Sequence, residues 1–451
     1  MPVADEQQME EPQASGGRRL WPRRWRTRIA AGIGAVALVG GSASWIDRER
    51  IAGFLVDDYL TKNGVAATYD IASIDPNRQV IENLVIGIPA RPDFTARRMV
   101  IELGVSWSGP EVQRITVDGA RAYATFVGGK FSLGALDPLV FADSNQPPAL
   151  PAINLVLRDA RALLLSDYGA VGVKLEGAGR LDDGFTGTLA ATAPGLGIEG
   201  CRARSATLYG KLTTKDGPPA LAGPLRLAGL ACKGAGLARA DIGTKLVLKR
   251  DFSRAEGDFA LGGEGLSLGG VSGEALGGSA RVTWSGEGAV LAHDLAVTGL
   301  AAPQGQLDRL ALEGTWRGPG DLSQGQWQGE LRGTGLRADS GVTASLASAQ
   351  QAAAGTLAAP LIAKARGGLA AALAGADFDV EAIIRHSPER ASLVLPYAQL
   401  VNAKGERVLA LSQISAGIGG QGITGLRGNL LAGGAGLPSI NGRMEQGADG
   451  L

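Results

Sequence analysis

Residues Ala206 to Thr214 read ATLYGKLTT, and their side chains alternate between two chemical kinds. The small or apolar positions are Ala206, Leu208, Gly210 and Leu212. The positions between them carry the polar or amphipathic side chains Thr207, Tyr209, Lys211 and Thr213. Successive side chains of a β-strand point to opposite faces of its sheet. The stretch therefore predicts a strand with one apolar and one polar face.

Alternation of period two recurs from about Val65 to the end of the chain. Further segments with this pattern are Ile242–Lys249, Ala280–Ser285, Arg309–Arg317, Phe378–Ile384, Ala391–Leu395 and Val408–Ile418. Gly, Pro and Asp turns separate them, such as residues 182–184 (DDG) and 216–219 (DGPP). No fixed-length repeat with a consensus accompanies the pattern, which disfavours a propeller or a regular solenoid. We expect a long antiparallel meander.

Nine large apolar residues are expected to share one face of this sheet. They are Leu208, Leu212, Leu246, Leu248, Val282, Trp284, Leu310, Leu312 and Trp316. An apolar face has to be covered by another layer or by an apolar ligand, yet few helices are expected and aromatic residues make up only 5% of the chain. One solution is a curved groove filled by acyl chains, with these nine residues as its lining. The other is an ordinary β-sandwich or solenoid.

An uncharged segment precedes the β-region. Residues 29–46 read IAAGIGAVALVGGSASWI. Six arginines stand just before it, namely Arg18, Arg19, Arg23, Arg24, Arg26 and Arg28. At about 1.5 Å per residue the segment nearly spans a hydrocarbon core of about 30 Å, and the arginines favour a cytoplasmic N-terminus. A single membrane anchor is predicted, with a cleaved signal peptide as the alternative.

The chain divides into six expected regions. Ile51, Phe54, Leu55 and Tyr59 recur at helical spacing after the membrane segment, and residues 345–375 are Ala-rich with few β-branched residues. The regions are 1–28, a disordered cytoplasmic basic tail; 29–46, a transmembrane anchor; 47–64, a juxtamembrane amphipathic helix; 65–344, an elongated β-groove; 345–375, a helical insertion; and 376–451, a further, truncated β-groove segment.

Composition and motifs argue against an enzyme. Lys and Arg number 44, as do Asp and Glu, so the chain has no net charge to attract nucleic acid. With 69 glycines, its two GxGxxG strings are expected by chance, and neither lies in a βαβ unit. The only histidines, His293 and His386, are best interpreted as surface residues. No catalytic residue, metal site or cofactor is expected.

Cys201 and Cys232 are the only cysteines, and both fall in the region expected to be exported. An oxidising compartment permits a disulfide between them. Two unrelated buried thiols are the alternative.

The segment NLVIGIPARPDFTARRMVIEL at Asn83–Leu103, preceded by YDIASID at Tyr69–Asp75, resembles the first strands of YdbH-type members of the AsmA-like group. These are bridge-like lipid-transfer proteins of the bacterial envelope. The resemblance implies an elongated groove that shields phospholipid tails between inner and outer membranes. It also implies a C-terminal strand that pairs with a small outer-membrane lipoprotein. Family members are considerably longer, so that strand is expected to be missing from a chain that stops at residues 447–451 (GADGL).

The expected fold is therefore mainly β: an N-terminal transmembrane helix, then an elongated, curved antiparallel β-sheet groove with a few short helices. The expected function is an inner-membrane-anchored periplasmic bridge that passes phospholipids between membranes, with phospholipids and the inner membrane as partners. Two alternatives are a secreted adhesin-like β-solenoid, which requires a cleaved leader, and an AsmA-like outer-membrane assembly factor, which differs only in cargo.

Overall fold

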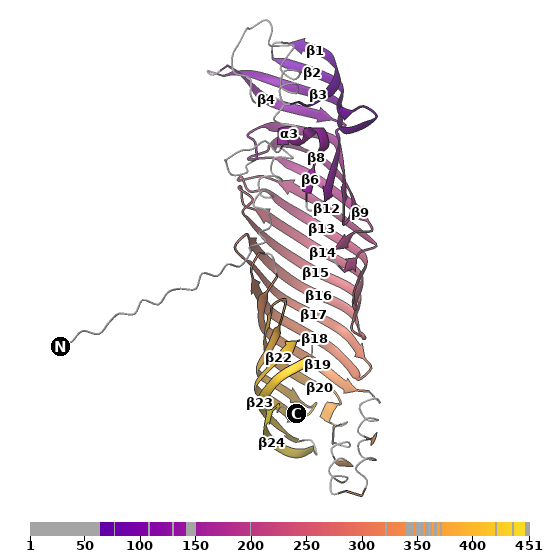
Figure 1. Ribbon diagram of the computed structural model, residues 1–451, viewed down its shortest axis with the longest axis vertical. Coiled ribbons are helices and arrows are strands. Elements are labelled where there is room, and N and C mark those ends of the chain that lie inside the picture. Colours follow the sequence, from indigo (N-terminus) through magenta and orange to yellow (C-terminus); the bar gives the residue numbers. More distant parts are fainter. Residues whose placement is uncertain are drawn as a thin grey trace, which may run out of the picture.

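The computed structural model describes residues 64–446, with gaps at 76, 107–108, 129, 141–149, 199, 321–322, 340–346, 420–421 and 435–436 and scattered gaps between 349 and 371. Its strands form one sheet of 24 strands. Most of them follow one another along the long axis of the molecule, and the C-terminal strands, drawn in yellow, turn back beside the strands that precede them (Figure 1). The predicted basic tail, membrane anchor and amphipathic helix, residues 1–63, lie outside the described residues. Among the residues described, no helix is both long and apolar enough to cross a membrane.

The first six strands of the sheet are β1 (Ala67–Asp75), β2 (Arg78–Ile88), β3 (Arg91–Ser106), β4 (Gly109–Asp118), β5 (Arg121–Val127) and the short β6 (Lys130–Ser132). β1 to β4 pair in chain order, whereas β5 pairs with β3 and with β6. Two short helical turns come next, the 3-10 turn η2 (Gly134–Leu136) and α3 (Asp137–Val140). The carboxylate of Asp93 on β3 accepts a hydrogen bond of 2.9 Å from the amide of Ala135, which ties η2 to the sheet.

The next strand, β7 (Asn154–Ser166), departs from the prediction of a purely antiparallel sheet. It runs parallel to β4 and also parallel to β5, which follow one another along the same edge of β7. A parallel pair requires a crossover connection of a dozen or more residues. Residues 128–153, which contain β6, η2 and α3, provide that length.

From β7 onward the chain forms an antiparallel meander. Its strands are β8 (Gly169–Arg180), β9 (Thr186–Pro194), β12 (Ser205–Thr213), β13 (Ala220–Cys232), β14 (Ala235–Leu248), β15 (Arg254–Leu268), β16 (Val271–Ser285), β17 (Ala289–Ala302), β18 (Gly305–Gly318), β19 (Gly325–Ala338), β20 (Ala376–His386), β21 (Ala391–Val401), β22 (Arg407–Gly419), β23 (Gly422–Gly434) and β24 (Leu437–Glu445). A small hairpin of β10 (Gly197–Ile198) and β11 (Cys201–Arg202) interrupts the path between β9 and β12. Several strands are longer than the segments predicted from the sequence. The glycine-rich part of such a strand has no alternation of apolar and polar side chains from which it could be predicted.

The predicted helical insertion at 345–375 connects β19 to β20 and is described only in part. Its described helical positions are 347–348, 351, 360, 363–364, 368–369 and 372–373. The extent of a helical insertion stays a prediction.

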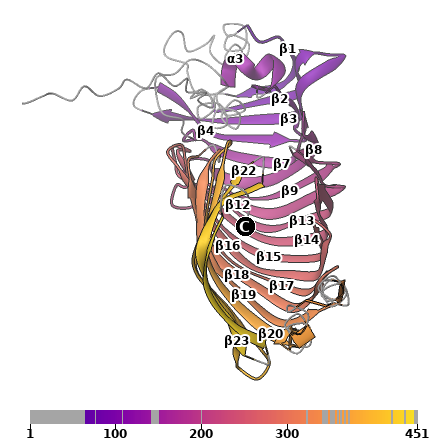
Figure 2. The ribbon, with the colours of Figure 1, turned by 60° about the horizontal axis from the view of Figure 1, so that its bottom comes forward.

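The fully buried core lies at the N-terminal end of the sheet. The largest side chains that are completely buried are Phe185, Met99, Ile115, Leu155 and Val117. Beyond it the sheet continues as a curved wall, whose strands appear as arcs in Figure 2. In β13 to β19 the only fully buried apolar side chains are those of Ala240 and Ala289. The large apolar residues of this wall are therefore not packed into a buried core.

Candidate functional site

The register of the meander aligns apolar residues in rows that cross the strands. Residues directly opposite one another on neighbouring strands point to the same face. Starting from Leu208, the cross-strand partners from β12 to β23 are Leu208, Leu225, Ile242, Leu261, Gly278, Leu295, Leu312, Leu331, Val380, Ala398, Leu411 and Leu430. No polar side chain interrupts this row.

A second row on the same face runs parallel to the first. Its members are Leu212, Leu221, Leu246, Gly257, Val282, Leu291, Trp316, Trp327, Ile384 and Leu393. On β18, for example, Leu312 and Trp316 lie four residues apart without an intervening bulge, so they share a face. The row between them is mostly glycine, alanine and Phe259, with Thr244 and His293 as polar members, so together the rows make a largely apolar face.

All nine residues singled out in the sequence lie on this apolar face. Leu208 and Leu312 belong to the first row, and Leu212, Leu246, Val282 and Trp316 to the second. Leu310 pairs with Val297 in a row beside the first. Leu248 and Trp284 both pair with Ala255, in a row beside the second. Each of the nine side chains is half-buried.

Partial burial distinguishes this face from the inside of a β-sandwich. A sandwich core packs at near-crystalline density, so its central Leu, Ile and Phe side chains are fully buried. In β13 to β19 no such side chain is fully buried. The apolar face is thus a surface that the described part of the chain leaves uncovered, and its extent is far above that of the scattered apolar residues on a typical soluble protein.

Aromatic rings on this face lie over glycines instead of standing away from the sheet. A Cβ atom added at Gly314 would come within 2.8 Å of the Trp327 ring, and one at Gly325 within 2.5 Å of the Trp316 ring. The same holds for Gly333 beneath the ring of Phe378. Glycine in a strand often marks a place where another group approaches the backbone closely. Here it lets large rings lie flat and keeps the apolar face smooth.

One polar pair sits on the apolar face. Nε1–H of Trp327 donates a hydrogen bond of 2.8 Å to Nε2 of His293, and the two rings are stacked with an interplanar angle of 8°. Because Nε2 accepts, the proton of the neutral imidazole is on Nδ1, which faces the carbonyl oxygen of Leu312 at 3.3 Å. His293 is half-buried here, in contrast to the surface position expected from sequence. The contacts with Leu312 and Trp327 hold the imidazole of His293 against the sheet.

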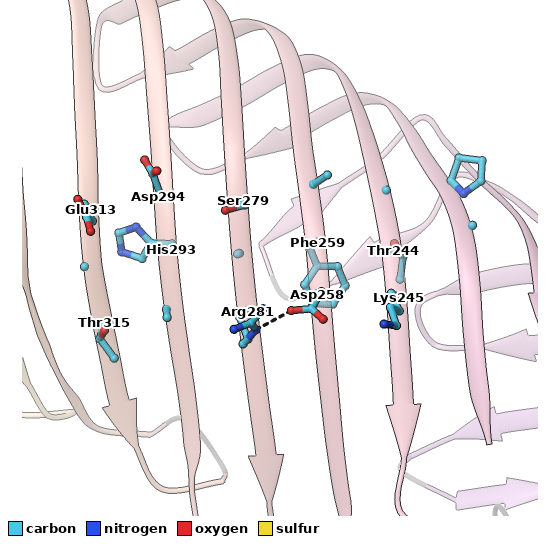
Figure 3. Close-up of a pocket in the computed structure, with 17 residues that line it drawn as sticks. Thr244, Lys245, Asp258, Phe259, Ser279, Arg281, His293, Asp294, Glu313 and Thr315 are labelled. Carbon is cyan, nitrogen blue, oxygen red and sulfur yellow. Dashed lines mark hydrogen bonds and ion pairs between the residues drawn. The ribbon is translucent and has the colours of Figure 1, made fainter. Parts of the chain in front are cut away.

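The opposite, polar face carries ion pairs that cross between strands. Arg226 pairs with Asp241 at 3.0 Å, and Arg281 pairs with Asp258 at 2.6 Å. The hydrogen bond from Arg281 to Asp258 raises the pKa of that guanidinium. A shallow open depression crosses β13 to β18 near the second of these pairs, and Lys245, Asp258 and Arg281 are among its lining residues (Figure 3). This face suits contact with water.

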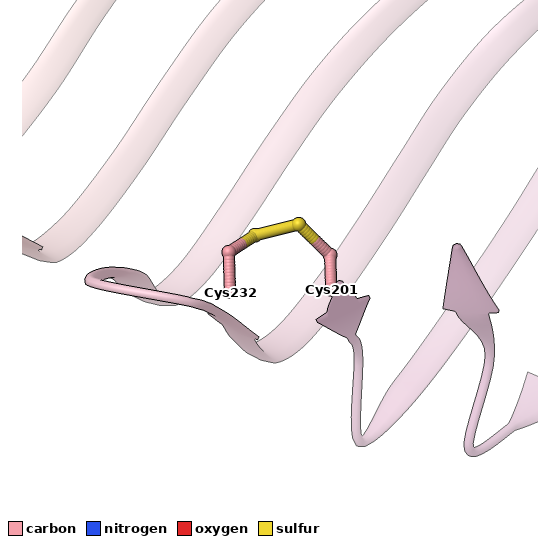
Figure 4. The surroundings of a disulfide bond; sticks show 2 residues. All are labelled: Cys201 and Cys232. Atoms are coloured by element: carbon pink, nitrogen blue, oxygen red, sulfur yellow. A yellow bond between two sulfur atoms is a disulfide. The ribbon is translucent and has the colours of Figure 1, made fainter. Parts of the chain in front are cut away.

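A disulfide joins Cys201 on β11 to Cys232 on β13, with an S–S distance of 2.02 Å (Figure 4). The two cysteines are direct partners in the β11–β13 pairing. The bond fastens the small β10–β11 hairpin to the meander. Sequence reasoning selected this pair from the expected oxidising compartment and from the position of both residues in one predicted strand-turn-strand region, but it did not predict that the two cysteines are direct cross-strand partners.

Several members of the apolar face were not singled out in the sequence, among them two aromatic residues. Phe259 and Trp327 follow the same alternation as their neighbours, but they lie in β15 and β19, where glycines at 257, 262, 263, 325 and 329 dilute the pattern. The alternation of Trp327 with Gln326 and Gln328 was the signal that would have identified β19.

A single-layer sheet with an uncovered apolar face along its length defines a class of elongated proteins that present an apolar surface to a partner or ligand. The chain matches the family model described as "YdbH-like: Intermembrane phospholipid transport protein YdbH" over residues 35–450. It belongs to the YdbH-like family, as its sequence resemblance indicated. This is a phospholipid-transport family and not an enzyme family. No curated protein and no solved structure matches the chain significantly.

Proposed function

We propose that this chain is an inner-membrane-anchored periplasmic bridge that shields phospholipid acyl chains on its apolar face and transfers them between inner and outer membranes. The observation that carries the proposal is the uncovered apolar face, whose large side chains are half-buried from β13 to β19. Acyl chains would remove this surface from water, a transfer that contributes about 25 cal/mol per Å² of apolar area. Membership of a phospholipid-transport family supports that choice of ligand.

The dimensions of the face suit movement along it. Neighbouring strands are about 4.8 Å apart, so the row from Leu208 to Leu430 extends roughly 50 Å. One leaflet of a bilayer has a hydrocarbon depth of roughly 15 Å. The face is therefore several times longer than one lipid tail, and no polar barrier interrupts its first row. A lipid can slide along it without exposing its tails.

The proposed lining includes the nine residues Leu208, Leu212, Leu246, Leu248, Val282, Trp284, Leu310, Leu312 and Trp316. Photo-crosslinking amino acids test it directly when placed in adjacent positions on opposite faces. Probes at Leu246 and Leu310 should capture phospholipid in cells, whereas probes at the neighbouring Lys245 and Arg309, both exposed, should not. Equal capture from both faces, or none from the leucines, would overturn the lipid conduit.

A charged substitution provides a functional counterpart. Leu310→Glu should block phospholipid transfer, because an unpaired charge on the apolar path costs several kcal/mol to desolvate. Arg309→Glu is the matched control, since its side chain lies on the polar face. Circular dichroism of both variants should show the β-sheet retained. Normal transfer by a folded Leu310→Glu protein would contradict the proposal.

A further inference from the structure

The two long edges of the meander differ in their aromatic content. One edge, here called the tryptophan edge, is formed by the turns at 214–219, 249–253 and 286–288 and continues past the end of β18. All three tryptophans that the structure describes, Trp284, Trp316 and Trp327, lie within three residues of the strand ends at this edge. The opposite edge is formed by the turns at 233–234, 269–270 and 303–304. Its large apolar residues are aliphatic: Leu268 and Val271 flank one turn, and the pairs Leu230–Leu237 and Leu300–Leu307 lie near the other two.

The same two edges differ in charge. The three turns of the tryptophan edge carry both signs of charge, on Lys215, Asp216, Lys249, Arg250, Asp251 and Glu287. The three turns of the opposite edge carry one charged residue, Lys233. Aromatic content and mixed charge thus coincide at one edge.

Contacts at the tryptophan edge order these groups. Nη2 of Arg250 donates a hydrogen bond of 3.0 Å to the carbonyl oxygen of Asp216, which joins two successive turns. Nε1–H of Trp284 donates one of 2.8 Å to the carbonyl oxygen of Gly320, in the loop after β18. The indole of Trp284 therefore has its apolar body on the apolar face and its polar N–H directed toward the turns.

Tryptophan favours boundaries where one end of the ring is in an apolar medium and the other is in water, as at the surface of a bilayer. We propose that phospholipids on the apolar face lie parallel to the strands. Their headgroups and ester linkages are at the tryptophan edge, and their acyl chains are directed toward the opposite edge. The mixed charges of the turns match a zwitterionic phosphodiester headgroup. The inference rests on the proposed function and adds to it a fixed orientation of the cargo.

Two photoactivatable phosphatidylcholines test this orientation on the full chain. One carries a diazirine on the headgroup, and the other carries it at the terminal carbon of an acyl chain. After loading from vesicles and irradiation, mass spectrometry should place headgroup adducts in peptides containing residues 249–254 and 284–288. Tail adducts should fall in peptides containing Leu237, Leu266 or Leu300.

The outcomes separate the two proposals. If neither probe labels the protein, the proposed function fails and the orientation fails with it. If both probes label the same peptides, or if the headgroup probe labels the opposite edge, lipid binding stands and the orientation is overturned.

Matched variants test the part played by charge. Lys249→Gln with Arg250→Gln should lower headgroup adducts at the tryptophan edge roughly threefold, a modest effect because exposed ion pairs are weak. Lys233→Gln, at the opposite edge, should leave them unchanged. Retained tail adducts in both variants would show that the sheet is intact. Equal headgroup labelling in both variants would count against charge recognition at this edge.

Discussion

Glycines on the apolar face have a packing role that their number alone does not reveal. At Gly329 an added Cβ would lie 2.1 Å from the carbonyl oxygen of Glu313 and 2.7 Å from Cζ2 of Trp327. At Gly262, on the polar face, the nearest atom would be the carbonyl oxygen of Asp241 at 3.6 Å, an ordinary contact. The two glycines therefore differ in what a methyl group would meet.

We expect Gly329→Ala to lower the free energy of unfolding by about 1–3 kcal/mol, as overpacking commonly does. Gly262→Ala should change it by less than about 0.5 kcal/mol. The midpoint of urea unfolding for the full chain measures both. Equal midpoints for the two variants would show that neither the Glu313 carbonyl nor the Trp327 ring crowds position 329.

Asp251 in the turn after β14 has an unusually acidic carboxyl group. Hydrogen bonds from the hydroxyl and amide of Ser253, with a smaller effect of Lys249, lower its pKa from 3.8 to about 2. A carboxyl that is more acidic in the folded than in the unfolded state stabilises the fold above the unfolded value of about 4. That contribution is lost as the pH falls from about 4 to about 2, and it is small because the group is partly exposed.

An NMR titration of the Asp251 carboxyl should therefore show a pKa of about 2. Ser253→Ala removes the hydroxyl and should raise that pKa toward its ordinary value. Ser387→Ala is a suitable control, because its hydroxyl bonds to the backbone of Arg390 and to no carboxylate. An unchanged titration in Ser253→Ala would contradict the assigned cause.

At the scale of strands, four acidic residues face one another across β17 to β20. The row consists of Asp294, Glu313, Glu330 and Glu381, and only Glu330 has an ion pair described, with Arg332. Like charges directly opposite on neighbouring strands are destabilising. The row therefore weakens the pairing of these strands.

Glu313→Lys should stabilise the sheet by roughly 0.4–2 kcal/mol, because it places a cation between two carboxylates. Thr315→Lys is its control. Thr315 lies two residues further along β18 on the same face, and its direct cross-strand partners are the uncharged Ala292 and Gln328. Unfolding measured at low and high salt should show the gain of Glu313→Lys shrinking as salt rises. A gain of equal size for Thr315→Lys would remove the electrostatic explanation.

The disulfide is the second feature at this scale. It closes a loop with a sequence separation of 31 and should contribute roughly 3 to 4 kcal/mol to stability through the entropy of the unfolded chain. A reductant should lower the unfolding midpoint of the natural protein but not of a Cys201→Ala, Cys232→Ala double variant. Two cysteines freely alkylated in protein taken from the periplasm would argue against the bond.

The sequence predicted which segments are strands, and on which face their side chains lie, better than it predicted which strands pair. Alternation assigned Leu208 and Leu312 to one face because it depends only on neighbours in the chain. It did not predict that the two would stand in one row, which depends on the register of every strand between them. The parallel pairing of β7 was missed for the same reason, since the crossover at 128–153 carries no periodic signal. The role of Trp327 was hidden because glycines and not apolar residues surround it.

At the scale of the whole molecule, the position of the N-terminus determines where the apolar face lies in the cell. The six arginines before residue 29 predict a cytoplasmic N-terminus and a periplasmic sheet. Alkaline phosphatase fused after Asn63 should be active, and a reporter that folds only in the cytoplasm should be inactive. A mature protein that begins near Trp45 would instead indicate a cleaved leader.

The rows of the apolar face have one more consequence. Leu248 at the end of β14 and Ala289 at the start of β17 stand in the same row, with Ala255 and Trp284 between them. Excising the β15–β16 hairpin would bring these two strands together with every side chain still on its own face. Each hairpin is thus a unit of length, adding about 10 Å without changing the cross-section. The number of hairpins therefore sets the length of the apolar face, while the chemistry of its surface stays the same.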